Sequence, residues 1–305
     1  MTDQTAAGSP AGSPTPGPRR RVVRPASPAR PDDGHKGSFG RVLAIAGGRG
    51  MSGAAALCGY GALRGGAGLV WLAIPESISS IVATIEPSWL TVPLPEDCAG
   101  RLSMDSQGAL EQALEGKDAV AAGPGWGQSD ELRQLAHWLY QSVSCPLVVD
   151  ADFLNLLAGA DDVLSHPGGP RILTPHPGEF ARLMNCSITT VEAARETLSR
   201  QFTDRYPVTL LLKGPATVVT DQQSQYINDT GNSGMGTGGC GDVLTGLIAA
   251  LVGQHMSPFE AAAFGAWLHG TAGDRAAAAL SRQGLIASDL ARFLPAAWQE
   301  AERTE

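Results

Sequence analysis

Between residues 231 and 242 the chain reads Gly231-Asn232-Ser233-Gly234-Met235-Gly236-Thr237-Gly238-Gly239-Cys240-Gly241-Asp242, and the apolar residues 243–251 follow directly. This pattern predicts a glycine-rich loop that enters a buried helix. The first N–H groups of a helix have no partner within it, and the helix dipole adds partial positive charge there. Glycines let an anion approach that backbone closely, so the junction is typical of a phosphate-binding site. The alternative is an ordinary loop before a helix.

Asp242 is the one carboxylate at this junction. A carboxylate that faces a phosphate repels it, so Asp242 is better suited to take a proton or to help hold a metal ion. The combination indicates phosphoryl transfer to a substrate hydroxyl. The competing interpretation is that Asp242 only caps the helix.

Short β-rich segments alternate with helical patterns from Gly34 onward. Strands are predicted at residues 41–46, 68–74, 119–122, 146–150, 171–174 and 209–213, a hairpin at 216–227, and helices at 52–64, 130–143, 242–252, 258–280 and 288–300. Because the strands are apolar throughout, we expect an α/β fold in which helices cover both faces of a mostly parallel sheet. Ligands in such folds bind beyond the carboxyl ends of the strands. Asp150, residues 174–179 and Lys213 fall at those ends.

Composition excludes several classes of protein. The chain has 305 residues, with 22 basic and 30 acidic residues and a formal charge of −8. An acidic chain without a Lys/Arg cluster in its folded part is a poor partner for nucleic acid or anionic membranes. No apolar run reaches the roughly 18–20 residues that span a bilayer. The five cysteines are widely spaced and contain no CxxC, which favours a reducing, cytoplasmic compartment.

The N-terminal residues 1–33 differ from the rest, being rich in Pro, Gly, Ser and Ala. They have almost nothing to bury, so we expect a disordered segment followed by one globular domain over residues 34–305.

Nine segments stand in a characteristic order along residues 34–300. They are residues 35–40 (His-Lys-Gly-Ser-Phe-Gly), 50–55 (Gly-Met-Ser-Gly-Ala-Ala), 64–70, 123–127 (Gly-Pro-Gly-Trp-Gly), 149–152 (Val-Asp-Ala-Asp), 173–179 (Leu-Thr-Pro-His-Pro-Gly-Glu), 212–219, 231–242 and 268–274. Together they resemble the ADP/ATP-dependent NAD(P)H-hydrate dehydratases, which share the ribokinase-like three-layer α/β/α fold.

The resemblance implies repair of NADH or NADPH that has taken up water across a nicotinamide ring double bond. In the family, ADP or ATP with Mg²⁺ phosphorylates the ring hydroxyl of the S epimer, NADHX or NADPHX. Phosphate then leaves, because it is a better leaving group than hydroxide, and the products are NAD(P)H, AMP and phosphate when ADP is the donor. Relatives form tetramers, so a homo-oligomer is expected. Many bacterial relatives carry an N-terminal epimerase domain, so a separate epimerase is the expected functional partner here.

The resemblance also assigns expected roles to individual residues. Asp242 would be the base on the substrate hydroxyl and a substrate contact, and the N–H groups of Gly239, Cys240 and Gly241 would hold the transferring phosphate. Residues along the nucleotide would be Lys213, Gly214, Pro215, Ala216, Thr217 and Gly241.

The expected contacts to the hydrated dinucleotide are Ala54, Gly125 and His176, with Asp242. His176 lies between two prolines, which limit the motion of its backbone. Glu179 is expected to help hold Mg²⁺ through water, or to be only a favourable charge in the first turn of a helix. Cys240 places a thiol beside the predicted anion site, which would make it sensitive to oxidation if it is more than a tolerated small side chain.

Two other functions remain open from the sequence. A kinase of the same fold that acts on a thiazole or pyrimidine alcohol would share the loop at residues 231–242. A catalytically silent nucleotide-binding module would have no need of Asp242.

Overall fold

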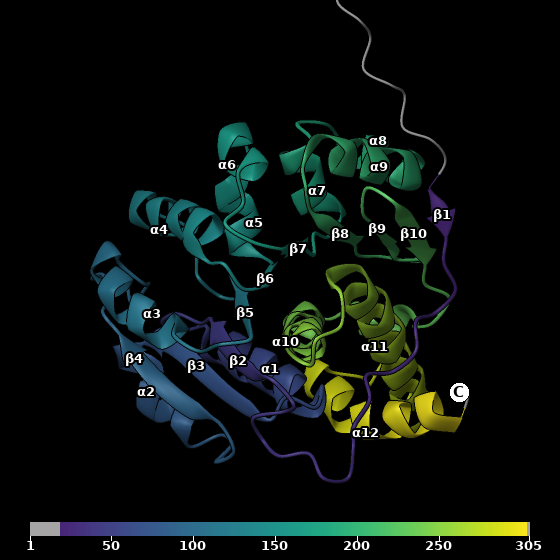
Figure 1. Ribbon diagram of the computed structural model, residues 1–305, viewed down its shortest axis with the longest axis horizontal. Coiled ribbons are helices and arrows are strands. Elements are labelled where there is room, and N and C mark those ends of the chain that lie inside the picture. The colour runs from purple at the N-terminus through teal and green to yellow at the C-terminus, as the bar shows by residue number, and fades with distance from the viewer. Residues whose placement is uncertain (1–18, 304–305) are drawn as a thin grey trace, which may run out of the picture.

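The computed structural model describes residues 19–303, in which ten strands form one sheet (Figure 1). The strand order is β1-β10-β9-β8-β7-β6-β5-β2-β3-β4. The strands are β1 (Arg20–Arg21), β2 (Arg41–Ile45), β3 (Leu69–Pro75), β4 (Leu90–Leu94), β5 (Ala119–Ala122), β6 (Leu147–Val149), β7 (Arg171–Leu173), β8 (Thr209–Leu212), β9 (Val218–Thr220) and β10 (Ser224–Ile227). Only β9 pairs antiparallel with its neighbours. The predicted mostly parallel α/β sheet is confirmed.

Helices cover both faces of this sheet (Figure 1). They are α1 (Ser52–Arg64), α2 (Glu76–Ala83), α3 (Gln107–Leu114), α4 (Asp130–Ser142), α5 (Asp152–Leu157), α6 (Asp161–Ser165), α7 (Pro177–Leu183), α8 (Ile188–Ala193), α9 (Arg195–Arg205), α10 (Cys240–Gly253), α11 (Pro258–Leu280) and α12 (Ala287–Arg303), with short 3₁₀ turns η1 (Met104–Ser106) and η2 (Ser233–Met235). Within residues 19–303 every helix is too short or too polar to cross a membrane.

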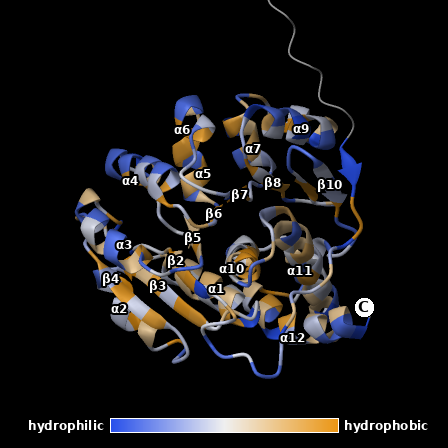
Figure 2. Cartoon of the chain, in the orientation of Figure 1, coloured by the Kyte–Doolittle hydropathy of each residue, from blue (hydrophilic) through white to orange (hydrophobic). Residues whose placement is uncertain are grey.

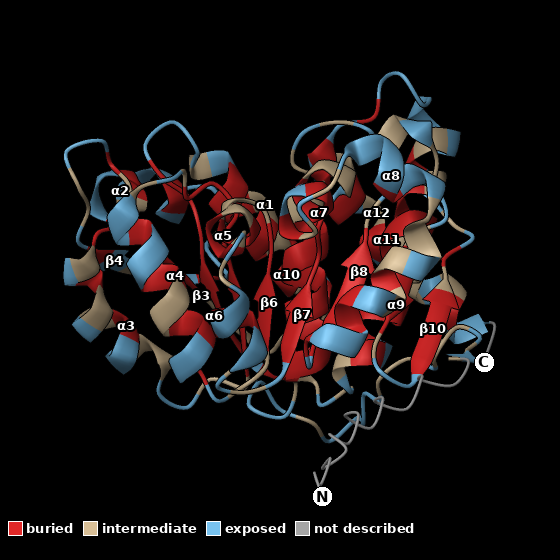
Figure 3. Cartoon of the chain, turned by 90° about the horizontal axis from the view of Figure 1, so that it is seen from above, coloured by how far each residue is buried: buried red, intermediate tan, exposed pale blue. Residues whose placement is uncertain are grey.

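The alternation of side chains along β2 shows why both layers form. Val42 and Ala44 pack with residues of α1, α10, α11 and α12, whereas Leu43 and Ile45 pack with residues of α3, α4, α5 and α9. All four side chains are fully buried, as Figure 3 shows for the strands at the centre of the sheet. Successive strand residues point to opposite faces, so an apolar strand requires cover on both.

Helix α10 is apolar around its whole circumference and lies at the centre of the molecule (Figure 2). Two glycines let it pack tightly on α1. A Cβ on Gly246 would lie 1.9 Å from the Cys58 carbonyl oxygen, and a Cβ on Gly61 would lie 2.1 Å from that of Val243. This close approach fixes the first turn of α10 relative to the sheet.

Residues 19–33 pack on the domain, which differs from the disorder expected up to residue 33. Strand β1 pairs with β10, Arg19 and Arg21 form ion pairs with Asp204 and Glu196 of α9, and the Arg24 guanidinium lies 4.3 Å from the Trp267 ring centre. Composition missed these contacts because arginines make most of them, although the partly buried Val22 also packs against the core. The expectation for residues 1–18 lies outside the described residues.

Candidate active site

Strands β5, β6, β7 and β8 end at one edge of the sheet, and several predicted site residues follow them directly. Gly123 follows β5, Asp150 follows β6, His176 closely follows β7 and Lys213 follows β8. Helix α10 packs across β2, β5 and β6 and begins at Cys240.

The N-terminus of α10 is built around Gly239, whose φ is +93°. A Cβ there would lie 2.5 Å from Leu57 Cδ1 and 3.0 Å from Ala287 Cβ, so only glycine fits. The first helical hydrogen bond runs from the Val243 N–H to the Gly239 carbonyl (3.2 Å). The N–H groups of Cys240, Gly241 and Asp242 therefore precede the helical ladder, which is the geometry of an anion site.

A buried ion pair lies against this helix start. Lys213 Nζ is 2.7 Å from Asp150 Oδ1, and the Thr245 hydroxyl donates to Asp150 Oδ2 (2.6 Å). The Asp150 side chain is 1% exposed and the Lys213 side chain 19%. Burial would lower the pKa of Lys213, but the charges of Asp150 and Glu179 outweigh it and raise that pKa, so the ammonium stays protonated.

Gly241 allows Lys213 to approach the helix. A Cβ on Gly241 would lie 3.1 Å from Lys213 Nζ and 3.6 Å from Asp150 Oδ2. The arrangement adds one full positive charge to the partial charge of the helix N-terminus, which favours a phosphate there.

Two further carboxyl groups share this cluster. Burial raises the pKa of Asp242 to about 7; the charge of Asp150 adds to the rise and Lys213 opposes it. Burial also raises the pKa of Glu179 to about 7, and Lys213, 4.0 Å from Glu179 Oε2, opposes that rise. A carboxylate with a pKa near neutrality suits a general base.

His176 is held in one tautomer at the start of α7. Its Nδ1 accepts the Gly178 N–H (2.9 Å), while the His176 backbone N–H donates to Glu179 Oε2 (2.7 Å). The ring proton is therefore on Nε2. Burial and the charges of Lys213 and Arg182 lower the pKa of His176, so the ring is neutral at pH 7. The ring is half-exposed, and its Nε2 lies 3.4 Å from Glu179 Oε1.

Ala54 and Gly125 lie against each other, and both residues are buried. Gly125 has a φ of +70°, and a Cβ there would lie 2.9 Å from Ala54 Cβ and 3.1 Å from Met51 Cβ. The two predicted substrate-side residues thus form one surface of small side chains, beside the half-exposed Met51.

The predicted nucleotide segment, residues 213–217, is a loop whose tip at residues 214–216 is exposed. Its base is fixed, since Arg195 Nη2 donates to the carbonyls of Leu212 (2.9 Å) and Lys213 (3.1 Å). Its far end is closed by the Asn228 N–H, which donates to the Thr217 carbonyl (2.9 Å).

Helix α11 holds both ends of the glycine-rich loop. Thr230 donates to the Trp267 carbonyl (2.9 Å), and Asp274 accepts the Gly231 N–H (2.8 Å). At the far end of the loop, His269 Nε2 donates to the Cys240 carbonyl (3.0 Å). Burial lowers the pKa of His269 to about 4, so this ring is neutral.

Cys240 contributes its backbone to the anion site, while its side chain is buried. Burial raises the pKa of its thiol to about 11. A protonated, buried thiol is a poor target for oxidation, which favours the interpretation of Cys240 as a tolerated small side chain.

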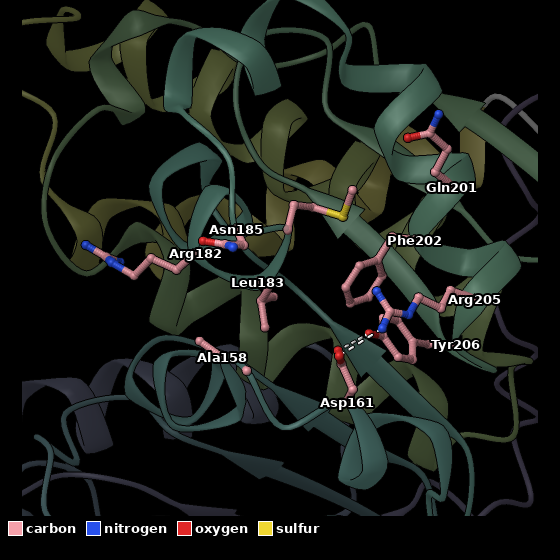
Figure 4. Close-up of a pocket in the computed structure, with 11 residues that line it drawn as sticks. Ala158, Asp161, Arg182, Leu183, Asn185, Gln201, Phe202, Arg205 and Tyr206 are labelled. Atoms are coloured by element: carbon pink, nitrogen blue, oxygen red, sulfur yellow. Dashed lines mark hydrogen bonds and ion pairs between the residues drawn. The ribbon is translucent and has the colours of Figure 1, made fainter.

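A cavity of about 740 Å³ lies away from this edge, among α5, α6, α7 and α9 (Figure 4). It is lined by Asp161, which accepts a hydrogen bond from Arg205 (2.8 Å), and by Arg182 and Phe202 among others. None of the predicted site residues lines it.

Sequence reasoning missed Thr245 and Arg195. Thr245 follows Asp242 by three residues, and therefore lies on the same face of α10; that spacing was the available signal. Arg195 lies 17 and 18 residues before its partners Leu212 and Lys213, and nothing in the local sequence marks it.

The fold and this edge define a class: an α/β protein in which the start of a buried helix lies beside a lysine and a carboxylate whose pKa is raised to about 7. A hydroxyethylthiazole kinase from Pyrococcus horikoshii shares the fold, with 16% identity and a TM-score of 0.58. A family model described as NAD(P)H-hydrate dehydratase matches residues 42–296. The chain belongs to the NAD(P)H-hydrate dehydratase family.

Similar proteins agree with that assignment. The bifunctional NAD(P)H-hydrate repair enzyme of Moorella thermoacetica is 45% identical over 269 residues, which are 88% of this chain and 51% of that protein. The ADP-dependent (S)-NAD(P)H-hydrate dehydratase of Neisseria meningitidis is 35% identical, with 86% of both chains covered. The ADP/ATP-dependent NAD(P)H-hydrate dehydratase of Bacillus subtilis, co-crystallised with ATP/Mg²⁺, is 28% identical with a TM-score of 0.76, covering 90% of this chain and 95% of that chain. This chain spans about half the length of the bifunctional relatives.

Proposed function

We propose that this chain is an ADP-dependent (6S)-NAD(P)H-hydrate dehydratase. The observation that carries the proposal is the start of α10, where three backbone N–H groups, Lys213 and a carboxylate with a pKa of about 7 come together. Family membership and the similarity to the ADP-dependent Neisseria meningitidis enzyme support the choice of substrate and of phosphoryl donor.

In the first step Asp242 accepts the proton of the ring hydroxyl. The hydroxyl oxygen forms a bond to the terminal phosphorus of ADP as the bond between that phosphorus and AMP breaks. The N–H groups of Cys240 and Gly241, with Lys213, stabilise the charge on the transferring phosphoryl group. Residues 213–217 are the proposed contact for the rest of the nucleotide.

In the second step the carbon–oxygen bond breaks, and its electron pair leaves with phosphate. The lone pair of the ring nitrogen forms a double bond to the carbon that has lost its oxygen. Loss of a proton from the neighbouring ring carbon then restores the dihydropyridine. We assign Ala54 and Gly125 to the surface that supports the hydrated dinucleotide, and the His176 Nε2–H to a hydrogen bond that orients it.

Mg²⁺ fits this site as an ion carried by the nucleotide. Among residues 19–303 no group of three His, Cys, Asp or Glu side chains is placed to hold a metal by itself. Mg²⁺ keeps waters and binds through phosphates and one or two carboxylates. Glu179, oriented by the His176 backbone N–H, is the carboxylate we propose for water-mediated contact. Its Oε1 has a longer contact, 3.4 Å from His176 Nε2, whereas both oxygens of Asp150 accept hydrogen bonds of 2.6–2.7 Å. The ion would neutralise phosphate charge.

We further propose that the enzyme works in the cytoplasm as a homo-oligomer, a tetramer by analogy, with a separate epimerase that converts the R hydrate. Gel filtration with light scattering measures the molar mass in solution and tests the proposed oligomeric state.

Product analysis tests the function. Incubation of hydrated NADH with ADP and Mg²⁺ should yield NADH, AMP and phosphate in equal amounts. A kinase for a small alcohol would instead leave the hydrate unchanged, and this outcome would replace the proposal.

A further inference from the structure

The site described so far offers few cations for a substrate that carries phosphates. Hydrated NADH and NADPH contain a pyrophosphate, and NADPHX adds a 2′-phosphate. The loops that directly follow β2 to β8 contain three lysines or arginines, namely Arg49, Arg101 and Lys213. Lys213 is committed to the start of α10. Arg49 and Arg101 are therefore the remaining candidates to bind a phosphate of the substrate.

Both arginines lie beside the Ala54–Gly125 surface. The Arg49 N–H donates to the Gly100 carbonyl (2.9 Å), and Arg49 precedes by two residues Met51, which contacts the Gly125 turn. Arg101 Cδ lies 3.2 Å from where a Cβ on Gly127 would stand, and its Nη1 donates to the Gln128 carbonyl (2.6 Å). The pair therefore flanks the turn at residues 123–127.

Partly exposed carboxylates hold both guanidinium groups, and Arg49 is the more exposed of the two arginines. Glu96 Oε1 accepts from Arg49 Nη2 (3.0 Å), and the Glu96 side chain is 17% exposed against 56% for Arg49. Asp97 holds the Arg101 guanidinium in the same way (2.7 Å); the Asp97 side chain is 19% exposed and the Arg101 side chain 34%. Burial would raise the pKa of Glu96, but the hydrogen bonds from Ser77 and the charge of Arg49 outweigh burial and lower that pKa. The carboxylates thus stay ionised, and the cations face solvent.

We propose that Arg49, supported by Arg101, forms a subsite that binds a phosphate group of the hydrated dinucleotide. Arg49 uses two of its five N–H donors on Glu96 and the Cys98 carbonyl, so others are available for a ligand. A guanidinium that is already oriented binds phosphate with less loss of side-chain freedom. Arg101 donates its hydrogen bonds to Asp97 and to the Gln128 carbonyl, and thereby positions the turn at residues 123–127. The identity of the ligand rests on the proposed function.

The test compares Arg49→Ala with wild type on both hydrates. We expect KM for the substrate to rise about tenfold, the effect of losing one charge-assisted hydrogen bond, with KM for ADP and kcat unchanged. An equal rise for NADHX and NADPHX assigns the subsite to the pyrophosphate. A rise for NADPHX alone assigns it to the 2′-phosphate. Unchanged KM for both hydrates overturns the proposal.

Arg133→Ala is the matched control, because Arg133 is 53% exposed and pairs with Asp130 (2.8 Å) on the outer helix α4. It should leave both KM values unchanged. Arg49→Lys keeps the charge but not the planar donors, and should give an intermediate KM.

Binding of the products NADH and NADPH, followed by their fluorescence, separates this proposal from the proposed function. A wild type that fails to convert either hydrate, yet binds NADPH with an affinity that Arg49→Ala weakens, overturns the function and keeps the subsite. A wild type that converts the hydrates, with Arg49→Ala identical to it in both assays, keeps the function and overturns the subsite.

Discussion

Lys213 Nζ lies 2.7 Å from Asp150 Oδ1, and this pair joins the end of β8 to the end of β6 directly beneath the start of α10. Thr245 completes it by donating to the other Asp150 oxygen at 2.6 Å. The relationship explains how a lysine at a strand end, usually a mobile side chain, is fixed where a phosphate is expected.

Thr245→Val removes the hydroxyl that holds Asp150. A buried carboxylate oxygen then lacks its donor, so we expect the free energy of unfolding to fall by about 2 kcal/mol and KM for ADP to rise several-fold as Lys213 loosens. Chemical denaturation and steady-state kinetics measure the two effects. Thr245→Ser should restore both. If Thr245→Val leaves KM for ADP at the wild-type value, Thr245 has no role in placing Lys213.

Gly241→Ala tests the space beside Lys213. The added Cβ would lie 3.1 Å from Lys213 Nζ, so the ammonium must move away from the helix start, and ADP should bind several-fold more weakly. Gly108→Ala, on α3, is the control, because a Cβ there meets nothing within 4 Å. Calorimetric titration with ADP compares them. Equal affinities in the two variants would argue against a Lys213 contact to the nucleotide.

Asp242→Asn should lower kcat by about a thousandfold while ADP still binds, because an amide cannot accept the hydroxyl proton. Asp162→Asn serves as the control and should have no effect, because the Asp162 side chain on α6 is exposed. Retention of near-normal turnover by Asp242→Asn would remove this residue from the mechanism.

The pH dependence follows from the raised pKa of Asp242, about 7. The base must be ionised, so the rate should fall as the pH drops below about 7. The charge of Glu179 contributes to raising that pKa; Glu179→Gln should therefore move the acid limb of kcat to lower pH. A limb that stays in place, or moves upward, contradicts the assignment of Asp242 as the titrating base.

His269 makes the fold sensitive to acid. Its pKa lies at about 4 in the folded protein against 6.5 ordinarily, so the unfolded chain binds the extra proton between these values. Stability is therefore complete above pH 6.5 and declines as the pH falls to 4, by about 3 kcal/mol. Chemical denaturation at several pH values should show that the stability of His269→Gln declines less between pH 6.5 and 4 than that of the wild type. The exposed His166→Gln should behave as wild type; an unchanged slope in His269→Gln would refute this source of acid sensitivity.

Periodicity predicted the elements that are long and apolar. The predicted helix at residues 52–64 is α1, the predicted strand at 119–122 is β5, and the predicted hairpin is β9 with β10. It missed β4, an edge strand that contains Pro93, and the helices α2, α3, α6 and α8, which have eight residues or fewer. It also missed the 11-residue helix α9. The local sequence is a poor predictor of such short elements, because packing against the rest of the protein determines whether they form.

The topology of parallel strands was enough to predict that Asp150, His176 and Lys213 meet at one edge, since carboxyl ends of neighbouring strands adjoin. The functional roles of these residues stay predictions. The bonds of Thr245 and Arg195 were beyond sequence reasoning, because each joins residues from separate elements and depends on how α9 and α10 pack. The ion pairs of residues 19–33 were missed for the same reason.

The most direct test is recovery of the dihydropyridine absorbance from purified hydrated NADH with Mg²⁺, compared among ADP, ATP and no nucleotide. We predict recovery that requires a nucleotide and is faster with ADP. Absence of recovery with both nucleotides, in protein that binds AMP, would contradict the proposed dehydratase activity.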